Sequence, residues 1–388
     1  MGNGAEGHAA AGALNAIATP ALVLDLPKLE RNIERMADCC RRLGIGLRPH
    51  VKTPKSLPVA ARLAAAGAFG FTVSTLQEAE YLAAAGYSDI FYAVPIDPHK
   101  APRAAELAKA GVNISLLTDS LAAAHAAAAT AEACETVLTM WIELDVDHYR
   151  TGIERSDPDF ETLARFLATH PWMRFAGLMS YGGASYNSAS VSATAALAER
   201  HRVALIEAKQ ALEASGIPCP ALSFGSTPAV MYARSLEGIT EARCGIYTFQ
   251  DLFQAGIGAC DKSDIALSVL TTVIGANPSL NRLTIDAGGL ALSKDRSTQG
   301  RPFDAGFGLV CDERGEIIPE MYVSTVSQEL GLVTTKDGSP VPFSRFPIGT
   351  RLRILPNHAD MTAAAYEEYF VVDDSQTVID RWQRTKRW

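Results

Sequence analysis

Between residues 19 and 264 the chain repeats one pattern, in which a short apolar run precedes a longer Ala-rich stretch. Apolar runs of four to eight residues are typical of buried strands, and longer stretches with apolar residues at three- and four-residue spacing are typical of helices. The first pair joins ALVLDL at 21–26 to a helix that Pro27 opens and Gly44 closes. Similar pairs follow up to ALSFGST at 221–227, so the pattern predicts about eight β–α units.

A series of β–α units produces parallel strands, because each helix returns the chain to the same edge of the sheet. Eight units favour a closed (β/α)8 barrel, and an open doubly wound sheet is the alternative. No Gly-x-Gly-x-x-Gly motif follows the first strand, which removes the usual reason to prefer the open sheet. We therefore predict an α/β fold with a (β/α)8 TIM-type barrel over residues 19–265.

After residue 265 the pattern changes to β-like runs separated by Gly, Pro and Asp turns, and helical periodicity is nearly absent. Examples are IALSVLTTVIGA, RLTIDAGG and GTRLRILPNH. We predict a second, mostly β domain over residues 266–388, and we expect residues 1–18 to pack on it.

The overall composition narrows the choice of partners. The chain has 388 residues, of which 48% are hydrophobic, and this is enough for a substantial core. It carries 35 Lys and Arg against 43 Asp and Glu, a net charge of −8. An acidic balance disfavours nucleic acid and anionic membranes as partners, and we expect a small-molecule substrate instead.

The number and spacing of the cysteines indicate the cellular compartment of the protein. Seven cysteines with one adjacent pair and no Cys-x-x-Cys spacing are typical of reduced thiols rather than of disulfides or a zinc knuckle. The N-terminal sequence lacks the basic region and dense apolar core of a signal peptide. No stretch reaches the ~18 apolar residues that a membrane span needs. We therefore expect a cytoplasmic protein.

The segment LRPHVKTPK at 47–55 gathers four basic side chains where a strand is expected to end. In a barrel such positions face the mouth, where reacting residues lie. Lys52 would be desolvated there, and positive charge on Arg48 and His50 would lower its pKa further. A lysine with a lowered pKa is the nucleophile that a Schiff base requires, whereas a solvated surface turn is the alternative.

Two Gly-containing segments lie near the end of the predicted barrel: FGSTP ends the eighth predicted strand, and RCGIY lies in the segment that leaves the barrel. Backbone N–H groups and hydroxyls in such segments bind anions, and phosphate sites on barrels favour the loops after the last strands. The candidate residues are Gly225, Ser226, Thr227, Gly245 and Ile246. An ordinary helix cap is the alternative.

The segment PNHADMT places His358 and Asp360 two residues apart. On an extended segment such residues project to one side, so an imidazole and a carboxylate could share a divalent metal ion. Two protein ligands would leave coordination positions open for water or substrate, as a catalytic ion needs.

In this order the segments resemble the D-threonine aldolase and D-serine dehydratase family, pyridoxal-phosphate enzymes of the alanine-racemase-like fold type. The resemblance covers nearly the whole chain and implies a cofactor-binding barrel followed by a β domain with a metal site. The matching motifs are TPALVLDL, RPHVKT, ELDVDHYRTG, YGGASY, GSTP, RCGIYTFQD, IDAGGLALSKD, SQELG and PNHADMTAAAYEEYFVV.

The resemblance also implies roles for individual residues. Lys52 matches the Schiff-base lysine, with His50 framing it. Arg150 matches an arginine beside the cofactor ring near its phenolic oxygen, and Tyr181 matches a tyrosine that borders the ring. The five candidate anion-binding residues correspond to the phosphate cradle. His358 and Asp360 match the metal pair that a β-hydroxy amino acid would chelate.

The sequence departs from the family at two places. Pro54 stands where relatives usually carry a histidine two residues after the Schiff-base lysine. The histidine that some aldolases carry next to Tyr181 is also missing. Proton transfer would then use water, Tyr181, Tyr186 or Lys52, and the substrate is put in doubt.

The second metal ligand suggests the reaction. In the family, dehydratases tend to carry Cys at the position of Asp360, whereas aldolases carry Asp. A carboxylate suits Mn²⁺, Mg²⁺ or Co²⁺, with Zn²⁺ as the alternative. We therefore expect retro-aldol cleavage of a D-threonine-like amino acid to glycine and an aldehyde. The alternative is a D-serine or D-3-hydroxyaspartate dehydratase that gives a 2-oxo acid and ammonia.

A protein that binds the cofactor without turnover is a different class. Such pyridoxal-phosphate homeostasis proteins consist of the barrel and lack the C-terminal β domain, which this sequence has. The fold type also implies a homodimer by analogy.

Overall fold

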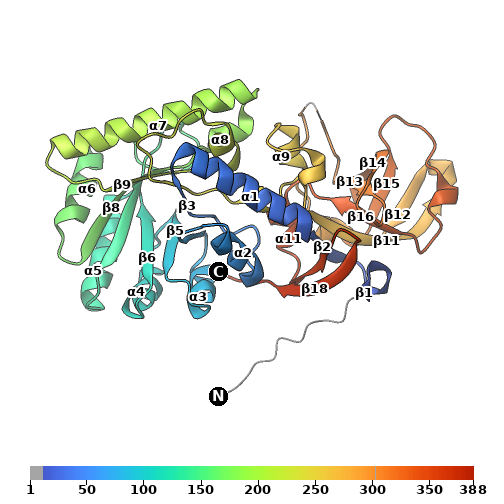
Figure 1. Ribbon diagram of the computed structural model, residues 1–388, viewed down its shortest axis with the longest axis horizontal. Helices are drawn as coiled ribbons and strands as arrows, with labels where there is room; N and C mark the ends of the chain where they lie inside the picture. The colour runs from blue at the N-terminus through green and yellow to red at the C-terminus, as the bar shows by residue number, and fades with distance from the viewer. Residues whose placement is uncertain (1–11, 302) are drawn as a thin grey trace, which may run out of the picture. The chain divides into compact units, whose positions relative to one another are not determined.

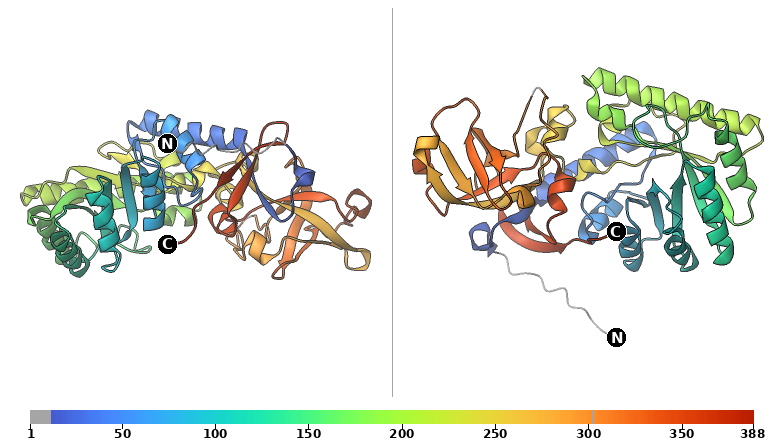
Figure 2. Two further views of the ribbon diagram at one scale, coloured as in Figure 1. Left: turned by 90° about the horizontal axis from the view of Figure 1, so that it is seen from below. Right: turned by 180° about the vertical axis from the view of Figure 1, so that it is seen from behind.

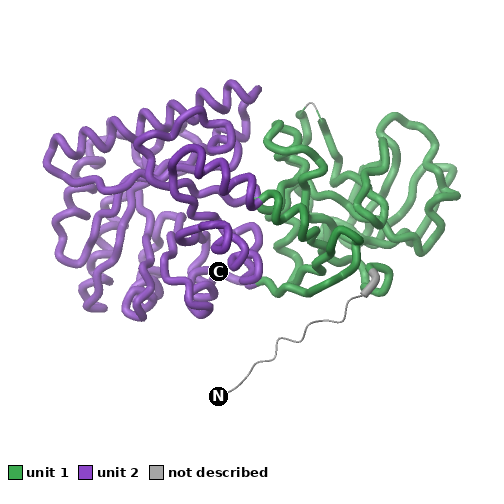
Figure 3. The backbone as a smooth tube through the Cα atoms, viewed as in Figure 1, with its two compact units in different colours: residues 1–32, 248–384 green, residues 33–247, 385–388 purple. Residues whose placement is uncertain are grey.

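The computed structural model describes residues 12–301 and 303–388. The chain divides into two compact units, each made of two separate stretches (Figures 1 and 3). Unit 1 takes its residues from 1–32 and 248–384, and unit 2 consists of 33–247 and 385–388.

Unit 2 is built on eight parallel strands. In spatial order they are β3 (Gly46–Leu47), β10 (Glu241–Ala242), β9 (Ala221–Phe224), β8 (Met173–Ser180), β7 (Leu138–Glu143), β6 (Asn113–Thr118), β5 (Asp89–Pro95) and β4 (Phe71–Val73). A parallel bridge between His50 and Thr72 joins the two ends of this order, and Val51 N donates to Thr72 O at 2.9 Å. The strands therefore close on themselves, which confirms the predicted barrel.

Helices alternate with these strands and cover the outside of the sheet (Figure 1). They are α1 (Leu26–Leu43), α2 (Leu57–Ala65), α3 (Leu76–Ala84), α4 (Ala101–Lys109), α5 (Leu121–Ala133), α6 (Asp159–Thr169), α7 (Val191–Ala214) and α8 (Thr227–Tyr232). Gly44, with φ of +68°, ends α1 as predicted, since glycine adopts this conformation without steric cost. Within the described part of the chain, no helix is both long and apolar enough to cross a membrane.

One predicted strand lies in the other unit. Residues 21–26, expected to form the first barrel strand, form β2 (Ala21–Asp25), which pairs with strands of the antiparallel sheet. All five β2 residues are buried, and an apolar run of this kind fits either sheet, because its pattern does not encode its partner. The eighth barrel strand is instead β10, two residues long, which directly precedes the RCGIY segment.

Unit 1 contains a ten-stranded sheet, seen from two further sides in Figure 2. Its strands are β1 (Gly12–Ala13), β2, β11 (Leu267–Asn277), β12 (Arg282–Ile285), β13 (Leu309–Cys311), β14 (Ile317–Val326), β15 (Gly331–Thr335), β16 (Arg351–Leu355), β17 (Glu368–Val372) and β18 (Thr377–Gln383). Because β11 pairs with both β12 and β16, the strands from β11 to β16 form a closed ring of antiparallel pairings. The predicted mostly β domain is confirmed, and the α-helices that follow residue 248 in its described part are the short α9 (Leu252–Gly256), α10 (Gly289–Leu292) and α11 (Ala359–Ala363).

The N-terminal segment lies on the unit 1 sheet. Leu14 and Ile17 belong to one buried apolar cluster with Leu270 of β11. The Arg351 guanidinium donates to the carbonyl of Ile17 at 3.0 Å. Residues 1–11, for which the same packing is expected, lie outside the described residues.

Candidate active site

A cavity of about 280 Å³ lies in unit 2. Its lining residues are His50, Lys52, Ser74, Ala93, Val94, Pro95, Arg150, Thr151, Met179, Tyr181 and Arg243. Several of them end or directly follow a barrel strand, as Pro95 ends β5 and Tyr181 follows β8. Active sites of (β/α)8 barrels lie at this carboxyl end of the strands. The cavity thus brings together all four residues for which catalytic roles are predicted: Lys52, His50, Arg150 and Tyr181.

Lys52 lies in a turn that begins where the barrel closes. His50 pairs with Thr72, and the chain then turns at 51–54. The imidazole is held on both sides: Lys52 N donates to its Nδ1 at 3.4 Å, and Ser74 Oγ lies 3.2 Å from its Nε2. These contacts fix the ring of His50 beside the lysine.

His50 does not carry the charge that the sequence argument gave it. Burial lowers the pKa of this imidazole well below its usual value, and the cations of Lys52, Arg243 and Arg150 lower it further. The lowered pKa favours the neutral form of the imidazole, whereas the sequence argument gave His50 a positive charge. His50 is instead a neutral hydrogen-bonding group within the cavity lining.

The other basic side chains of the 47–55 segment are paired with carboxylates. The Arg48 Nε donates to Glu241 Oε2 at 2.9 Å, and its guanidinium also binds Asp89. The Lys55 Nζ lies 3.0 Å from Glu78 Oε1. Arg48 is therefore paired with two carboxylates.

Arg150 and Tyr181 face each other in the cavity wall. The Arg150 guanidinium lies 4.5 Å from the centre of the Tyr181 ring, within the range of a cation–π contact. The neighbouring Thr151 hydroxyl donates to Glu143 Oε2 at 2.8 Å, and Glu143 is 2% exposed. Burial raises the pKa of the Glu143 carboxyl, although Thr151 and Arg150 oppose this effect.

Arg243 is a cavity residue for which the sequence argument gave no role. Its Nε donates to Ser223 Oγ at 2.6 Å and its Nη2 to the carbonyl of Ser180 at 3.1 Å. The signal available in the sequence was the RCGIY segment, which Arg243 opens and which already held the candidates Gly245 and Ile246. With Lys52 and Arg150 it gives the lining three cations, and no carboxylate is among the described residues that line the cavity.

The two glycines of the proposed phosphate cradle stand where a side chain does not fit. A Cβ on Gly225 would lie 2.8 Å from the backbone nitrogen of Arg243. A Cβ on Gly245 would lie 2.9 Å from the carbonyl oxygen of His50. Both contacts are to backbone, so glycine keeps these loops in close approach beside the cavity residues.

The hydroxyls of the cradle differ in their environment. Ser226 Oγ caps α8 by accepting from Ala229 N at 3.3 Å, and it lies 2.8 Å from Ser185 Oγ. This serine therefore fulfils the helix-cap alternative. Thr227 Oγ1 is buried and has no hydrogen-bond partner within the described ranges, and Ile246 begins the next short helix. A buried hydroxyl without a partner fits a phosphate oxygen that the residues present would bind.

Replacing Gly245 with alanine is expected to weaken binding of pyridoxal phosphate by about tenfold or more, because overpacking of this kind costs about 1–3 kcal/mol. Titration of the metal-free apoprotein with the cofactor, followed by absorbance, measures the change. Gly256→Ala is the control, since its Cβ meets only the Phe303 ring at 3.7 Å. Equal affinity of both variants would contradict the cradle.

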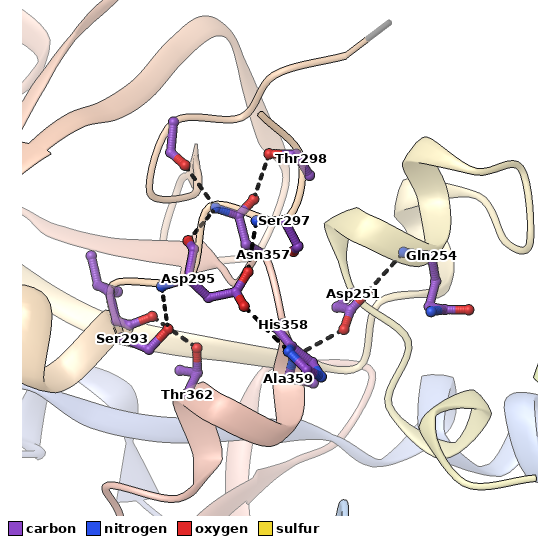
Figure 4. Close-up of polar contacts among 12 residues, drawn as sticks. Asp251, Gln254, Ser293, Asp295, Ser297, Thr298, Asn357, His358, Ala359 and Thr362 are labelled. Carbon is purple, nitrogen blue, oxygen red and sulfur yellow. Dashed lines mark hydrogen bonds and ion pairs between the residues drawn. The ribbon is translucent and has the colours of Figure 1, made fainter. Parts of the chain in front are cut away.

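The predicted metal pair lies in unit 1 at the start of α11. His358 of this pair is shown in Figure 4. The His358 Nδ1 lies 3.4 Å from Asp295 Oδ2, and Asp360 Oδ1 is buried without a hydrogen-bond partner within the described ranges. Those ranges contain no group of three or more His, Cys, Asp or Glu side chains arranged to hold a metal ion. An imidazole with a buried, unpartnered carboxylate oxygen fits a two-ligand site in which water or substrate completes the coordination.

Two further carboxylates, missed by the sequence argument, surround this pair. Asp251 is fully buried, and its Oδ2 accepts from Ala359 N at 3.0 Å. Burial raises the pKa of Asp251 to about 6, although His358 opposes this. Burial would also raise the pKa of Asp295, but hydrogen bonds from His358 and Ser297 lower it to about 2. Figure 4 shows Asp295 directed at His358, and Asp251 directed at the amide of Ala359.

Metal binding at His358 is expected to depend on pH. Burial would lower the pKa of the imidazole, but Asp295, Asp360 and Asp251 outweigh burial and raise it to about 9. At pH 7 an ion must displace a proton, so affinity should rise about tenfold per pH unit toward pH 9 and then level off. Calorimetry in buffers of different ionisation enthalpy should detect about one proton released at pH 7. A metal affinity that does not change with pH would contradict this role of His358.

The raised pKa of His358 also affects the stability of the metal-free protein. Its contribution to the free energy of unfolding is fully present below pH 6.5 and is lost as the pH rises through about 9.

Asp295 contacts the His358 ring at Nδ1, which would leave Nε2 to bind a metal ion. Asp295→Asn is therefore expected to weaken metal binding by about 10–100-fold, as loss of such an orienting partner typically does. Metal titration by calorimetry measures the effect. Asp304→Asn is the control, because Asp304 pairs with Arg296 instead.

Comparison with known proteins assigns the family. Residues 24–252 match the model of the alanine racemase N-terminal domain, and residues 266–372 match the putative serine dehydratase domain. The chain therefore belongs to the alanine-racemase-like family of pyridoxal-phosphate enzymes that includes the D-threonine aldolases and D-serine dehydratases. This confirms the resemblance that the sequence motifs indicated.

Individual relatives are similar over nearly their full length. The D-threo-3-hydroxyaspartate dehydratase of Delftia sp. (strain HT23) is 44% identical over 95% of this chain and 98% of its own. A solved structure of that enzyme, with a cysteine replaced by alanine and in the metal-free form, has a TM-score of 0.94 at 43% identity and covers 97% of this chain and 100% of its own. The 3-hydroxy-D-aspartate aldolase of Paracoccus denitrificans (strain Pd 1222) is 31% identical over 91% of this chain and 88% of its own.

Proposed function

We propose that this chain is a pyridoxal-phosphate- and metal-dependent lyase that removes water from a D-3-hydroxyaspartate-type amino acid and gives a 2-oxo acid and ammonia. The observation that carries the proposal is the cavity lined by Lys52, Arg150 and Arg243 without a carboxylate among its described lining residues. Such a lining favours an anionic cofactor and a substrate with two carboxylates. The 44% identity to a dehydratase of this substrate supports the reaction.

Each cavity residue has a role in this proposal. Bound pyridoxal phosphate would supply the electron sink for charge that develops at the substrate Cα. Lys52 Nζ would attach the cofactor and afterwards take the proton from Cα. The Arg150 guanidinium, stacked on Tyr181, would hold positive charge beside the ring. Neutral His50, hydrogen-bonded to Lys52 N and near Ser74 Oγ, would stand beside Lys52 in place of the family histidine that Pro54 replaces.

The metal pair has a separate role. An ion held by His358 and Asp360 would supply a Lewis acid for the β-oxygen of the substrate. Asp295 and the fully buried Asp251 would keep the pair in place through His358 and the backbone of Ala359. The family comparison supports metal use, since a metal-free form is described for a variant of the Delftia dehydratase.

Retro-aldol cleavage is the second candidate, favoured by Asp360. Solved variants of the Delftia dehydratase replace a histidine and the cysteine two positions after it, and His358 and Asp360 have the same spacing here. This chain therefore carries a carboxylate where the dehydratase pattern has a thiol. A carboxylate favours Mn²⁺, Mg²⁺ or Co²⁺, and a thiolate favours Zn²⁺.

A product assay decides between the two reactions. The purified holoprotein is incubated with D-threo-3-hydroxyaspartate and either Mn²⁺ or Zn²⁺. Dehydration gives oxaloacetate and ammonia, whereas retro-aldol cleavage gives glycine and glyoxylate. D-Threonine distinguishes the same reactions through 2-oxobutanoate or acetaldehyde. Absence of all these products with both metals would overturn the proposal.

The proposal includes a cytoplasmic homodimer. The seven cysteines are all free thiols, which suits a reducing compartment. The homodimer is inferred from the fold type alone, and sedimentation of the holoprotein measures it.

A further inference from the structure

A buried chain of three polar side chains lies outside the cavity lining in unit 2. His201 of α7 contacts Ser180 through Nδ1 and Asp147 through Nε2, and both distances are 2.6 Å. The order Ser–His–Asp is that of a hydrolytic triad, but Ser180 and His201 are each only 1% exposed. A substrate cannot reach this hydroxyl, so the three residues do not form a nucleophilic site.

The protonation states of Asp147 and His201 set the direction of the hydrogen bonds among these three side chains. Burial would raise the pKa of Asp147, but Arg200 and His201 outweigh burial and lower it. Burial lowers the pKa of His201 although Asp147 opposes this, which favours the neutral imidazole. The Nε2–H group then donates to the Asp147 carboxylate, and the Ser180 hydroxyl donates to Nδ1. Both nitrogens of His201 are thereby satisfied.

His201 joins the two chain segments that carry a facing pair of cavity residues. Asp147 lies three residues before Arg150, in a segment that the Leu144–Ile153 bridge closes. Ser180 ends β8 and directly precedes Tyr181. The Arg150 guanidinium lies 4.5 Å from the centre of the Tyr181 ring. These two side chains thus belong to two segments that the His201 imidazole joins through Asp147 and Ser180.

The same imidazole also contacts the strand that leads to the phosphate cradle. Its ring centre lies 5.4 Å from that of Phe224, which ends β9 and precedes Gly225. The carbonyl of Ser180 accepts from Gly225 N at 3.3 Å and from Arg243 Nη2 at 3.1 Å. The side chain of Ser180 is therefore hydrogen-bonded to His201, and its backbone carbonyl binds Gly225 and Arg243 of the proposed site.

We propose that His201 is a positioning residue that sets Arg150 against Tyr181 and so fixes the ring of the bound cofactor. This inference rests on the proposed cofactor chemistry of Lys52. A misplacement of about 1 Å by a residue remote from the reacting atoms can cost about 100-fold in rate. Loss of the imidazole should therefore act on kcat more than on KM.

The test compares variants of the holoprotein by visible circular dichroism of the bound cofactor and by kcat and KM with D-threo-3-hydroxyaspartate. His201→Leu removes both hydrogen bonds and should lower kcat about 10–100-fold and reduce the dichroism band. His201→Gln should restore most of both signals, because an amide supplies an acceptor and a donor on one group as the neutral imidazole does. Adding Asp147→Asn to His201→Leu should lower kcat little further, since each of the two changes removes the same contact between His201 and Asp147.

Two controls separate positioning from stability. Arg200→Gln removes the exposed ion pair on Asp147 at 2.5 Å but leaves His201, and it should keep the wild-type signals. Leu205→Ala removes a buried contact on the same helix and should lower the melting temperature while the dichroism band persists. A His201→Leu variant with wild-type kcat and dichroism overturns the inference, as does an equal loss of the band in Leu205→Ala. A wild-type protein that binds no cofactor overturns the proposed function and this inference together.

Discussion

Replacing Lys52 with alanine is expected to abolish covalent attachment of pyridoxal phosphate and to remove the absorption band near ~420 nm. No other lysine lines the described part of the cavity, so no side chain there can take over its role. Lyase activity should fall by several orders of magnitude, because Lys52 is also the group proposed to take the Cα proton. Absorption spectra of the purified variant and the wild type measure the first effect, and product assays measure the second.

Lys55→Ala is the matched control for this experiment. It removes a lysine three residues away whose Nζ is engaged by Glu78 at 3.0 Å. The control should keep the band, and borohydride reduction followed by peptide mass spectrometry should locate the cofactor on Lys52. An unchanged spectrum in the Lys52 variant, or attachment at another lysine, would contradict the assignment.

Removal of the metal is expected to have the second largest effect. Chelation, or Asp360→Ala, should abolish product formation but leave the ~420 nm band, because the metal pair and Lys52 belong to different units. Asp360→Ala should weaken metal binding by at least ~100-fold, more than loss of an orienting partner does. Product assays measure the loss of activity, the absorption spectrum measures the band, and calorimetry measures metal binding. Asp304→Asn, outside the pair, should retain both activity and metal.

Asp360→Cys sharpens this experiment. A thiolate in place of the carboxylate should shift the preference from Mn²⁺ toward Zn²⁺. If the ligand decides the reaction, the ratio of oxaloacetate to glyoxylate should rise as well. A variant that keeps the wild-type metal preference and product ratio would show that Asp360 decides neither.

The alternation of apolar runs and helical stretches was sufficient to predict the barrel, because it depends on local periodicity. The pairing partners of a strand are not local. The run at 21–26 has the pattern of a buried strand, but it pairs with β11 and β17 in unit 1. Conversely, β10 has only two residues and produces no apolar run, so the eighth barrel strand could not be recognised.

In the candidate site, too, the features that depend on local sequence could be predicted and the non-local contacts could not. Lys52, Arg150 and Tyr181 stand in motifs, and the sequence placed them in one site. The orientation of His358 by Asp295 joins residues 63 positions apart, and no spacing rule contains that contact. The neutral state of His50 depends on burial and on surrounding cations, which only the folded chain defines.

The closure of the barrel at His50 and Thr72 has a consequence for folding and cofactor binding. Thr72 N donates to the carbonyl of Pro49 at 2.8 Å, so the seam is made by the residues that directly precede Lys52. A cofactor bound at Lys52 would stabilise the closed form by mass action. Opening of the barrel at this seam would then be slower in the loaded protein than in the protein without cofactor.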